Sequence, residues 1–376
     1  MEDPGLLDLE RPGLLTNFAA VAADRRRGLD ALVAAGIPPH CVIAPEHGYW
    51  GTEQAGEGGS ESRDAVTGIP VISSYQVHDQ ELVDLIAGSG VDGVLVDLQD
   101  VGCRFYTYPW SMADVMAACS RLGLPVHVLD RPAPLPSGPL GPGLDEEHCA
   151  SFVGRINIPL RHGARLGDLA HHLVEHHLES PLDLTVTAAP GEDGDAPWVP
   201  PSPNLPTLSA LALYPGTGLV EGTTWSEGRG TTLPFEVLGA PWADHRLAGM
   251  LREADLPGIQ VRETAFRATH GDFAGQRLHG VQLHLEEDAA DFVRRLDVDP
   301  IRLGMSVLRI MRSLHEEGDF WRRNAPDRPP FIDLLWGSPA LREGIEDGAD
   351  DEQILAASPT PLVPERTPVA PERTAP

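Results

Sequence analysis

The sequence predicts an α/β protein in which a Rossmann-like parallel-sheet domain is followed by a smaller α+β domain. Over the first 190 residues, short apolar runs bounded by Gly, Pro or Asp alternate with stretches whose apolar residues recur every three or four positions. Residues 190–206 contain six prolines, a composition typical of a rigid connector. After this connector the chain is less regular and mixes Gly/Thr-rich loops with isolated helical and alternating patterns.

The expected elements of the first domain are buried strands joined by helices. The patterns predict strands at 13–17, 41–44, 69–74, 91–98, 124–130 and 184–188, and helices at 24–35, 79–87 and 110–122. Strand–helix–strand alternation favours a parallel sheet with both faces covered. No G-x-G-x-x-G follows the first strand, so a dinucleotide is not expected. Polar segments follow several strands, at the edge where such sheets bind ligands.

The second half of the chain supplies helices near 243–254 and 298–316 and an alternating strand at 278–285. The last residues repeat P-E-R-T and contain no core-forming pattern, which predicts a disordered, polyproline-like segment. The expected organisation is an N-terminal extension at 1–12, a Rossmann-like domain at 13–215, a smaller α+β domain at 216–356 and a disordered tail at 357–376.

Composition excludes several classes of function. The chain of 376 residues has 56 acidic and 28 basic side chains, a net charge of −28. Such a surface repels nucleic acid and anionic membranes, so neither is an expected partner. Every basic residue is an arginine, because the sequence contains no lysine. This excludes Schiff-base chemistry and the phosphate-binding lysine of a P-loop.

Cysteines, histidines and the N-terminus add weaker indications. The four cysteines form no C-x-x-C pair and three lie in or beside apolar runs, which favours buried free thiols. His172 and His176 have the i, i+4 spacing of a metal site, but no third ligand is evident, so no metal is expected. No basic leader opens the chain, so a cytoplasmic location is expected.

Five polar segments carry the candidate chemistry. Glu46 follows a predicted strand in PEHGYWG, where desolvation can raise the pKa of a carboxyl group that then serves as a general acid. The other segments supply amides, acids and aromatic rings, the usual lining of a carbohydrate site. A structural role is the alternative for each. These candidates are Asp100, Arg104 and Tyr106 in DLQDVGCRFYTYPW, Arg161 and His162 in PLRHG, Asn204 in PSPNLP, and Glu227 and Arg229 in EGTTWSEGRG.

The residue types favour a glycosidase that needs no cofactor. Two carboxyl groups, or one carboxyl group and an acetamido group of the substrate, suffice to cleave a glycosidic bond. No G-x-S-x-G nucleophile elbow and no cysteine–histidine motif accompanies them.

Six segments resemble, in the same order, the exo-β-N-acetylmuramidases of the NamZ family, glycoside hydrolase family 171. They are APEHGYWGTEQAGE, DLQDVGCRFYTYPWSM, VLDRPAPL, SFVGRINIPLRHG, WVPPSPNLPT and YPGTGLVEGTTWSEGRGTTLPFEVLGAPW. The resemblance covers residues 13–355. It implies an active site in a cleft between the two domains. It also implies release of N-acetylmuramic acid from the non-reducing ends of peptidoglycan fragments.

The resemblance further implies site residues. Glu46 is the leading catalytic acid, and Glu227 and Asp100 are further catalytic candidates. The lactyl carboxylate of N-acetylmuramic acid needs a cation, and Arg229 between two glycines is favoured over Arg104 and Arg131. The implied substrate-binding residues are His47, Gln54, Arg104, Tyr106, Asp130, Arg131, Arg161, His162, Asn204 and Arg229.

Two positions depart from the family pattern. Leu140 stands in PLGP where relatives usually have the glutamate of VEGP, and Thr224 in EGTT replaces an amide. Two alternatives therefore stay open. One is an exo-glycosidase for another N-acetylated sugar, and the other is a saccharide-binding protein without catalytic activity.

Overall fold

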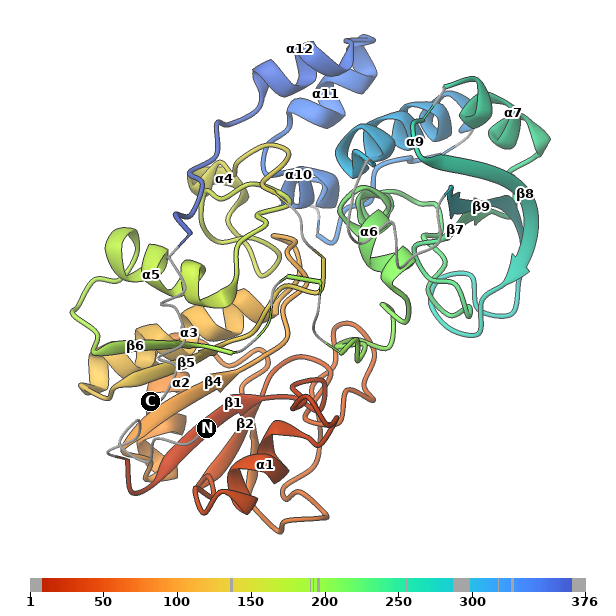
Figure 1. The fold of residues 1–376 in the computed structure, drawn as a ribbon. Helices are drawn as coiled ribbons and strands as arrows, with labels where there is room; N and C mark the ends of the chain where they lie inside the picture. The colour runs from red at the N-terminus through yellow and green to blue at the C-terminus, as the bar shows by residue number, and fades with distance from the viewer. Residues whose placement is uncertain are drawn as a thin grey trace.

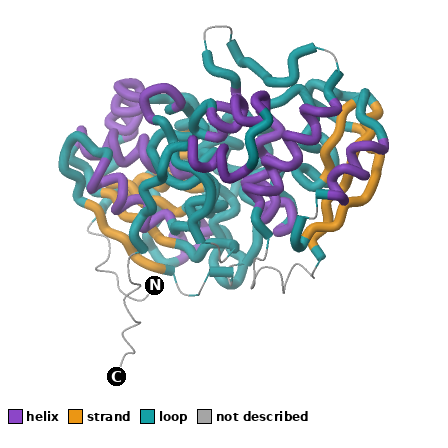
Figure 2. Tube along the Cα trace, turned by 90° about the horizontal axis from the view of Figure 1, so that it is seen from above, coloured by secondary structure: helices purple, strands orange, loops and turns teal. Residues whose placement is uncertain are grey.

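The protein contains two sheets at opposite ends of the molecule, with helices and loops between them (Figures 1 and 2). The structure is a computed structural model. It describes residues 9–366 except 136–137, 190, 192, 195–196, 255, 287–297, 317 and 326–327. Within this part of the chain, no helix is long and apolar enough to cross a membrane.

The first sheet has six parallel strands in the order β3-β2-β1-β4-β5-β6, which confirms the predicted Rossmann-like domain. All six predicted strands are present, with ends that differ by up to two residues. They are β1 (Pro12–Thr16), β2 (Cys41–Ala44), β3 (Val71–Ser73), β4 (Gly93–Asp97), β5 (Val126–Asp130) and β6 (Leu184–Ala188).

Helices cover both faces of this sheet. Leu29 and Leu32 of α1 pack with Leu14 and Val42 on one face, and Leu15 and the other alternate strand residues join the main core on the opposite face. Each leucine side chain that becomes fully buried contributes about 1.5–3 kcal/mol. The covering helices are α1 (Gly28–Ala34), α2 (Asp79–Ser89), α3 (Tyr108–Leu122) and α5 (Leu166–His176), while the short α4 (Glu146–Cys149) lies away from the sheet, near α10 (Figure 1).

The strand order reverses at β1, which lies between β2 and β4. In open α/β sheets the crevice at such a switch point, outside the carboxyl ends of the strands, is the usual ligand site. The loops after β1 and β2 meet there: Asn17 donates to the hydroxyl of Tyr108 at 2.5 Å, and that hydroxyl lies 3.5 Å from the carbonyl oxygen of Glu46. The fold thus brings the PEHG segment to the switch point.

The second sheet is antiparallel and has the order β7-β9-β8. Helices α6 and α9 approach closely beside it: an added Cβ on Gly216 would lie 1.9 Å from the carbonyl oxygen of Pro300. The elements are α6 (Leu208–Thr217), the 3-10 helix η2 (Gly218–Gly222), β7 (Val237–Ala240), α7 (His245–Glu253), β8 (Ile259–Arg267), β9 (Arg277–Leu285), α9 (Pro300–Leu314), α10 (Phe331–Trp336), α11 (Ala340–Asp347) and α12 (Asp351–Ala357).

The start of the expected disordered tail is packed on the protein. Residues 358–366 run from α12 past α4 towards the first domain (Figure 1). The side chain of Asn157 donates to the carbonyl oxygen of Thr360 at 3.0 Å, and Leu362 N donates to the Asn157 carbonyl at 2.9 Å. Backbone hydrogen bonds need no apolar pattern in the sequence, which explains why the disorder prediction is wrong here. Residues 367–376 lie outside the described residues.

Deleting the chain from Ser358 onward is expected to lower the melting temperature by a few degrees. The truncation removes the Ser358 hydroxyl that accepts from Trp336 Nε1 at 2.9 Å, and the Pro359 carbonyl that accepts from Gly143 at 2.8 Å. Hydrogen bonds of this kind are worth about 0.5–1.5 kcal/mol each, or about 1–3 kcal/mol together. Differential scanning fluorimetry measures the loss. A truncation after Arg366 keeps these bonds and is the control, and an equal loss in both would contradict the assignment.

Candidate active site

An interdomain cavity of about 260 Å³ lies between the two domains. Residues from both parts of the chain line it, and we name it the inner cavity. Its polar lining contains two carboxylates, two guanidinium groups and several amides and hydroxyls. The lining residues are Glu46, His47, Ala55, Gly56, Phe105, Tyr106, Thr107, Phe152, Val153, Ser202, Asn204, Leu205, Tyr214, Glu221, Arg229, Phe235, Arg322, Asn324, Phe331 and Leu335.

Glu46 is held in this cavity by two hydrogen bonds. Its Oε1 accepts from the backbone N–H of Gly56 at 2.7 Å, and its Oε2 accepts from the hydroxyl of Thr107 at 2.6 Å. Thr107 immediately precedes helix α3, so the carboxylate lies near a helix N-terminus. Glu46 is buried. Both of its oxygens are therefore fixed in direction before any substrate binds.

The loop that carries Glu46 is tight. His47 has a φ of +69°, a left-handed conformation that is uncommon outside glycine. Gly51 is also left-handed, and an added Cβ would lie 1.9 Å from the ring of Phe18. Nδ1 of His47 lies 3.0 Å from the carbonyl oxygen of Glu53. Because a carbonyl oxygen only accepts, Nδ1 of His47 carries the proton. Burial lowers the pKa of His47, and the negative charge of Glu46 offsets part of that shift.

Arg229 lies between two carboxylates. Its Nη1 is 2.7 Å from Oε2 of Glu221 and 3.2 Å from Oε1 of Glu227. Its guanidinium group also lies 5.0 Å from the ring centroid of Phe235. Burial raises the pKa of Glu221, while the charge of Arg229 opposes that shift. Glu221 is thus a second carboxylate of the inner cavity, beside Glu46.

Asn204 supplies a hydrogen-bond donor that is not used within the protein. Its Nδ2 atom is buried and has no hydrogen-bond partner among the described residues. Its backbone N–H donates to the hydroxyl of Ser202 at 3.2 Å, which fixes the Pro-rich connector at the cavity. Leaving a buried amide N–H without a hydrogen-bond partner costs free energy. A ligand with an acceptor oxygen at this position would remove that cost.

The inner cavity contains five of the residues singled out from the sequence: Glu46, His47, Tyr106, Asn204 and Arg229. Two more, Gln54 and Glu227, line an adjoining cavity of about 310 Å³ that shares Glu221, Arg229 and Arg322 with it. Sequence reasoning did not select Glu221 or Arg322. Glu221 stands in the EGTTWSEGRG segment already identified, but Arg322 lies in a stretch that carries no recognisable signal.

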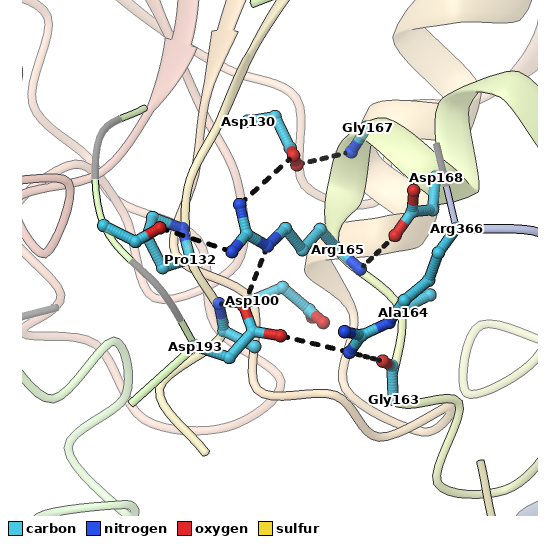
Figure 3. Close-up of polar contacts among 12 residues, drawn as sticks. Asp100, Asp130, Pro132, Gly163, Ala164, Arg165, Gly167, Asp168, Asp193 and Arg366 are labelled. Atoms are coloured by element: carbon cyan, nitrogen blue, oxygen red, sulfur yellow. Dashed lines mark hydrogen bonds and ion pairs between the residues drawn. The ribbon is translucent and has the colours of Figure 1, made fainter. Parts of the chain in front are cut away.

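Asp130 belongs to a separate buried cluster rather than to the inner cavity (Figure 3). Its Oδ1 accepts from Gly167 N at 2.8 Å, and its Oδ2 lies 4.0 Å from Nη1 of Arg165. Arg165 donates to Asp193 at 2.8 Å, and Arg366 from the C-terminal segment reaches the same carboxylate at 3.0 Å. The cluster joins the end of β5, the start of α5 and the C-terminal segment. This placement corrects the expectation that Asp130 contacts substrate.

Three arginine candidates also have structural partners. Arg104 is fully buried and donates to four carbonyl oxygens, two of them in α10, so it fastens the second domain to the first. Arg131 pairs with Asp97 at 2.6 Å. Arg161 donates to the Gly138 carbonyl at 3.1 Å.

Asp100 and His162 face each other at 3.3 Å. Asp100 also accepts from the backbone N–H of Gly102 at 2.8 Å. Neither side chain lines the inner cavity. The structure therefore does not support a catalytic role for Asp100, nor a substrate-binding role for His162, Arg104, Arg131 or Arg161.

Replacing Asp130 by Asn is expected to stabilise the protein above pH 6. Burial raises the pKa of Asp130 to about 6, whereas its ordinary value is 3.8. The wild-type protein therefore loses stability as the pH rises from about 4 through about 6, and the amide avoids this loss. We expect a gain of about 3 kcal/mol at pH 7.5, because the pKa of Asp130 is raised by about two, and almost none at pH 4. Urea unfolding at both pH values measures it, and a pH-independent difference would contradict the assignment.

The histidine pair expected on a helix face lies on α5, where His172 is buried and its ring centroid is 4.7 Å from that of His176. Within the described ranges, no group of three or more His, Cys, Asp or Glu side chains is placed to hold a metal ion. All four cysteines are buried free thiols, as predicted.

Comparisons with known proteins agree with this architecture. Two family models match the chain: the N-terminal domain of exo-β-N-acetylmuramidase NamZ over residues 13–209, and its C-terminal domain over residues 212–362. The peptidoglycan β-N-acetylmuramidase NamZ of Bacillus subtilis (strain 168) is 37% identical over 356 residues, which cover 92% of this chain and 82% of the relative.

Two crystal structures of DUF1343 family proteins from Bacteroides fragilis NCTC 9343 have the same fold. One gives a TM-score of 0.76 at 25% identity and covers 93% of this chain and 90% of the other. The second gives 0.72 at 29% identity, with 94% and 90% covered. Because both family models and the Bacillus relative cover nearly the whole chain, the protein belongs to the NamZ family of exo-β-N-acetylmuramidases.

Proposed function

We propose that the protein is an exo-acting glycosidase that releases N-acetylmuramic acid from the non-reducing ends of peptidoglycan fragments. The observation that carries the proposal is the inner cavity. Its size suits one sugar ring, because it lies just below the volumes of about 300–1,000 Å³ typical of drug-sized ligands. The carboxyl groups of Glu46 and Glu221 line it, together with the Asn204 amide, whose Nδ2 has no hydrogen-bond partner in the part of the chain that the structure describes. The name of the Bacillus relative supplies the substrate class.

In the proposed reaction Glu46 is the general acid. It transfers its proton to the glycosidic oxygen as the bond from that oxygen to C1 breaks. Two routes then deliver water to C1. Glu221 takes the proton of the attacking water, or the acetamido oxygen of the sugar attacks C1 first and water opens the ring that it forms. Asn204 is placed to donate to a sugar oxygen, through the Nδ2 group that lacks a partner in the protein.

The two departures from the family pattern lie outside the inner cavity. Leu140 exchanges backbone hydrogen bonds with Arg161, at 2.8 and 2.9 Å. Thr224 donates to the carbonyl oxygen of Asp319 at 3.0 Å. Neither change alters the surroundings of Glu46. The position of these residues therefore favours an active enzyme over a silent saccharide-binding protein.

The proposal is tested with a chromogenic β-glycoside of N-acetylmuramic acid and with the corresponding N-acetylglucosamine glycoside. Release of chromophore from the muramic substrate, with weaker release from the other, is the expected result. Preferred cleavage of the glucosamine substrate would instead assign the enzyme to another N-acetylated sugar. Calorimetric binding of a muramyl disaccharide without any release would identify a saccharide-binding protein. Proton NMR of the first product distinguishes retention from inversion.

A further inference from the structure

A second pocket opens beside Glu46. It has a volume of about 560 Å³, and its lining includes Tyr75, Thr107, Asp114 and Phe152. We name it the side pocket. Three residues line both the side pocket and the inner cavity: Gly56, Thr107 and Phe152. Two of these, Gly56 and Thr107, donate the hydrogen bonds that hold the Glu46 carboxylate. The carboxylate therefore lies at the boundary between the two spaces.

This position determines which groups of a substrate can occupy each space. A general acid must come within about 2.6–3.2 Å of the oxygen that it protonates. The glycosidic oxygen must consequently lie beside Glu46, with one sugar on each side of it. The inner cavity has room for the terminal sugar. We propose that the side pocket is the subsite for the next sugar, on the reducing-end side of the bond that is cleaved. This inference rests on the proposed exo-glycosidase function.

The side pocket has the lining of a sugar subsite. Phe152 is 46% exposed, an unusual exposure for a large apolar ring. Its ring lies nearly parallel to that of Phe331, with centroids 6.2 Å apart and an angle of 12°. This pairing holds the Phe152 ring at the boundary, where its free face can pack on the C–H face of a sugar. Tyr75 offers a hydroxyl to the sugar, while the carboxylate of Asp114, also in the lining, already pairs with Arg155 and His78.

Tyr75 also connects the pocket to the catalytic carboxyl group. Burial, and to a lesser extent the negative charge of Glu46, raises the pKa of Tyr75 to about 12. A tyrosine hydroxyl is protonated at neutral pH even at its ordinary pKa, so the Tyr75 hydroxyl can donate a hydrogen bond to the departing sugar.

A second space could hold the next sugar instead, and it adjoins the inner cavity beside Arg229 rather than beside Glu46. The adjoining cavity of about 310 Å³ shares Asp272, Phe273 and Arg322 with a larger one of about 780 Å³ that contains Trp242. We name these two spaces together the distal groove. Neither Gly56 nor Thr107 lines it. Trp242 is 46% exposed, as Phe152 is, so the two rings form a matched pair for a test.

The experiment compares Phe152→Ala and Trp242→Ala on two substrates. One is the disaccharide of N-acetylmuramic acid β-linked to N-acetylglucosamine, and the other is the methyl β-glycoside of N-acetylmuramic acid. Phe152→Ala is expected to lower kcat/KM on the disaccharide about tenfold, the effect of one lost ring contact. Its loss on the methyl glycoside, which has no second sugar, is expected to be at least fivefold smaller. Trp242→Ala should change neither value by more than twofold.

Further variants and controls keep the outcomes distinct. Phe152→Trp keeps an aromatic face and should restore most of the disaccharide activity, while thermal melting checks that each variant is folded. A disaccharide-selective loss in Trp242→Ala instead of Phe152→Ala would place the second sugar in the distal groove. Equal losses of Phe152→Ala on both substrates would overturn the subsite. If the wild-type protein cleaved neither muramic substrate, the proposed function itself would fail.

Discussion

Replacing Glu46 by Gln is expected to lower kcat by about 10²–10⁴-fold while leaving folding and substrate binding nearly intact. This range is the usual contribution of a positioned general acid. The amide is isosteric with the carboxyl group and preserves both hydrogen bonds of the site. Its oxygen can accept from Gly56, and its NH₂ group can donate to the hydroxyl of Thr107. What the amide lacks is a proton that it can transfer to the glycosidic oxygen.

Glu236→Gln is the matched control for this variant. Glu236 is also buried and also accepts a hydrogen bond from a threonine hydroxyl, that of Thr207 at 2.5 Å, but it lines neither the inner cavity nor the side pocket. Its replacement should leave turnover within twofold of wild type. Steady-state kinetics on the muramyl disaccharide, with calorimetric binding of the same ligand, separates kcat from affinity. Near-native turnover of Glu46→Gln would remove Glu46 from the mechanism.

The parallel sheet was predictable because most of its strands are short apolar runs bounded by turn residues. The second domain was harder to read. Helix α6 is buried all round, with every residue from Ala210 to Thr217 inside, so its sequence shows no helical periodicity. Strand β8 alternates irregularly because much of it is exposed. Apolar patterns record burial, and they fail where an element is wholly buried or largely exposed.

The candidate site was only partly predictable, since sequence order does not reveal which strand ends are neighbours. Asp130 and Glu46 both follow apolar runs, but β5 and β2 are separated by β4 and β1 in the sheet. Three strand spacings amount to about 14 Å, too far for both carboxyl groups to serve one sugar ring. The substrate-binding role predicted for Arg104 lacks support for another reason. A sequence shows that an arginine follows a strand, but not that four backbone carbonyls surround it.

Arg229 was the favoured partner for the lactyl carboxylate, but its surroundings argue for Arg322. Glu221 and Glu227 already lie at 2.7 and 3.2 Å from the Arg229 guanidinium, so another carboxylate brought there would be repelled. Arg322 pairs with Asp272 at 2.6 Å, and the side chain of that aspartate is 66% exposed. An exposed pair of this kind is worth little, so a substrate carboxylate can replace Asp272.

Replacing Arg322 by Ala is therefore expected to lower kcat/KM on the muramic substrate about 10- to 150-fold, the loss of one charge-assisted hydrogen bond of roughly 1.5–3 kcal/mol. The glucosamine analogue has no lactyl group, so its kcat/KM should fall by less than threefold. Arg322 lines the inner cavity and both parts of the distal groove, whereas its neighbour Arg323 lines only the larger part. Arg323→Ala is thus the control and should leave the preference between the sugars unchanged.

Arg229→Ala completes the comparison. It leaves Glu221 without its countercharge in the inner cavity, where the terminal sugar of either substrate would bind. Its losses should be similar on the two substrates, and the ratio of their kcat/KM values should stay near that of wild type. The opposite result, a muramic-selective loss in Arg229→Ala with no change of preference in Arg322→Ala, would return the lactyl carboxylate to Arg229. In that case Glu221, whose pKa burial raises, would have to bind a proton when the substrate enters, because three carboxylates cannot share one guanidinium group without repulsion. In the Arg322→Ala variant, this proton would make kcat/KM on the muramic substrate fall as the pH rises. The kcat/KM of the same variant on the glucosamine analogue would show no such fall.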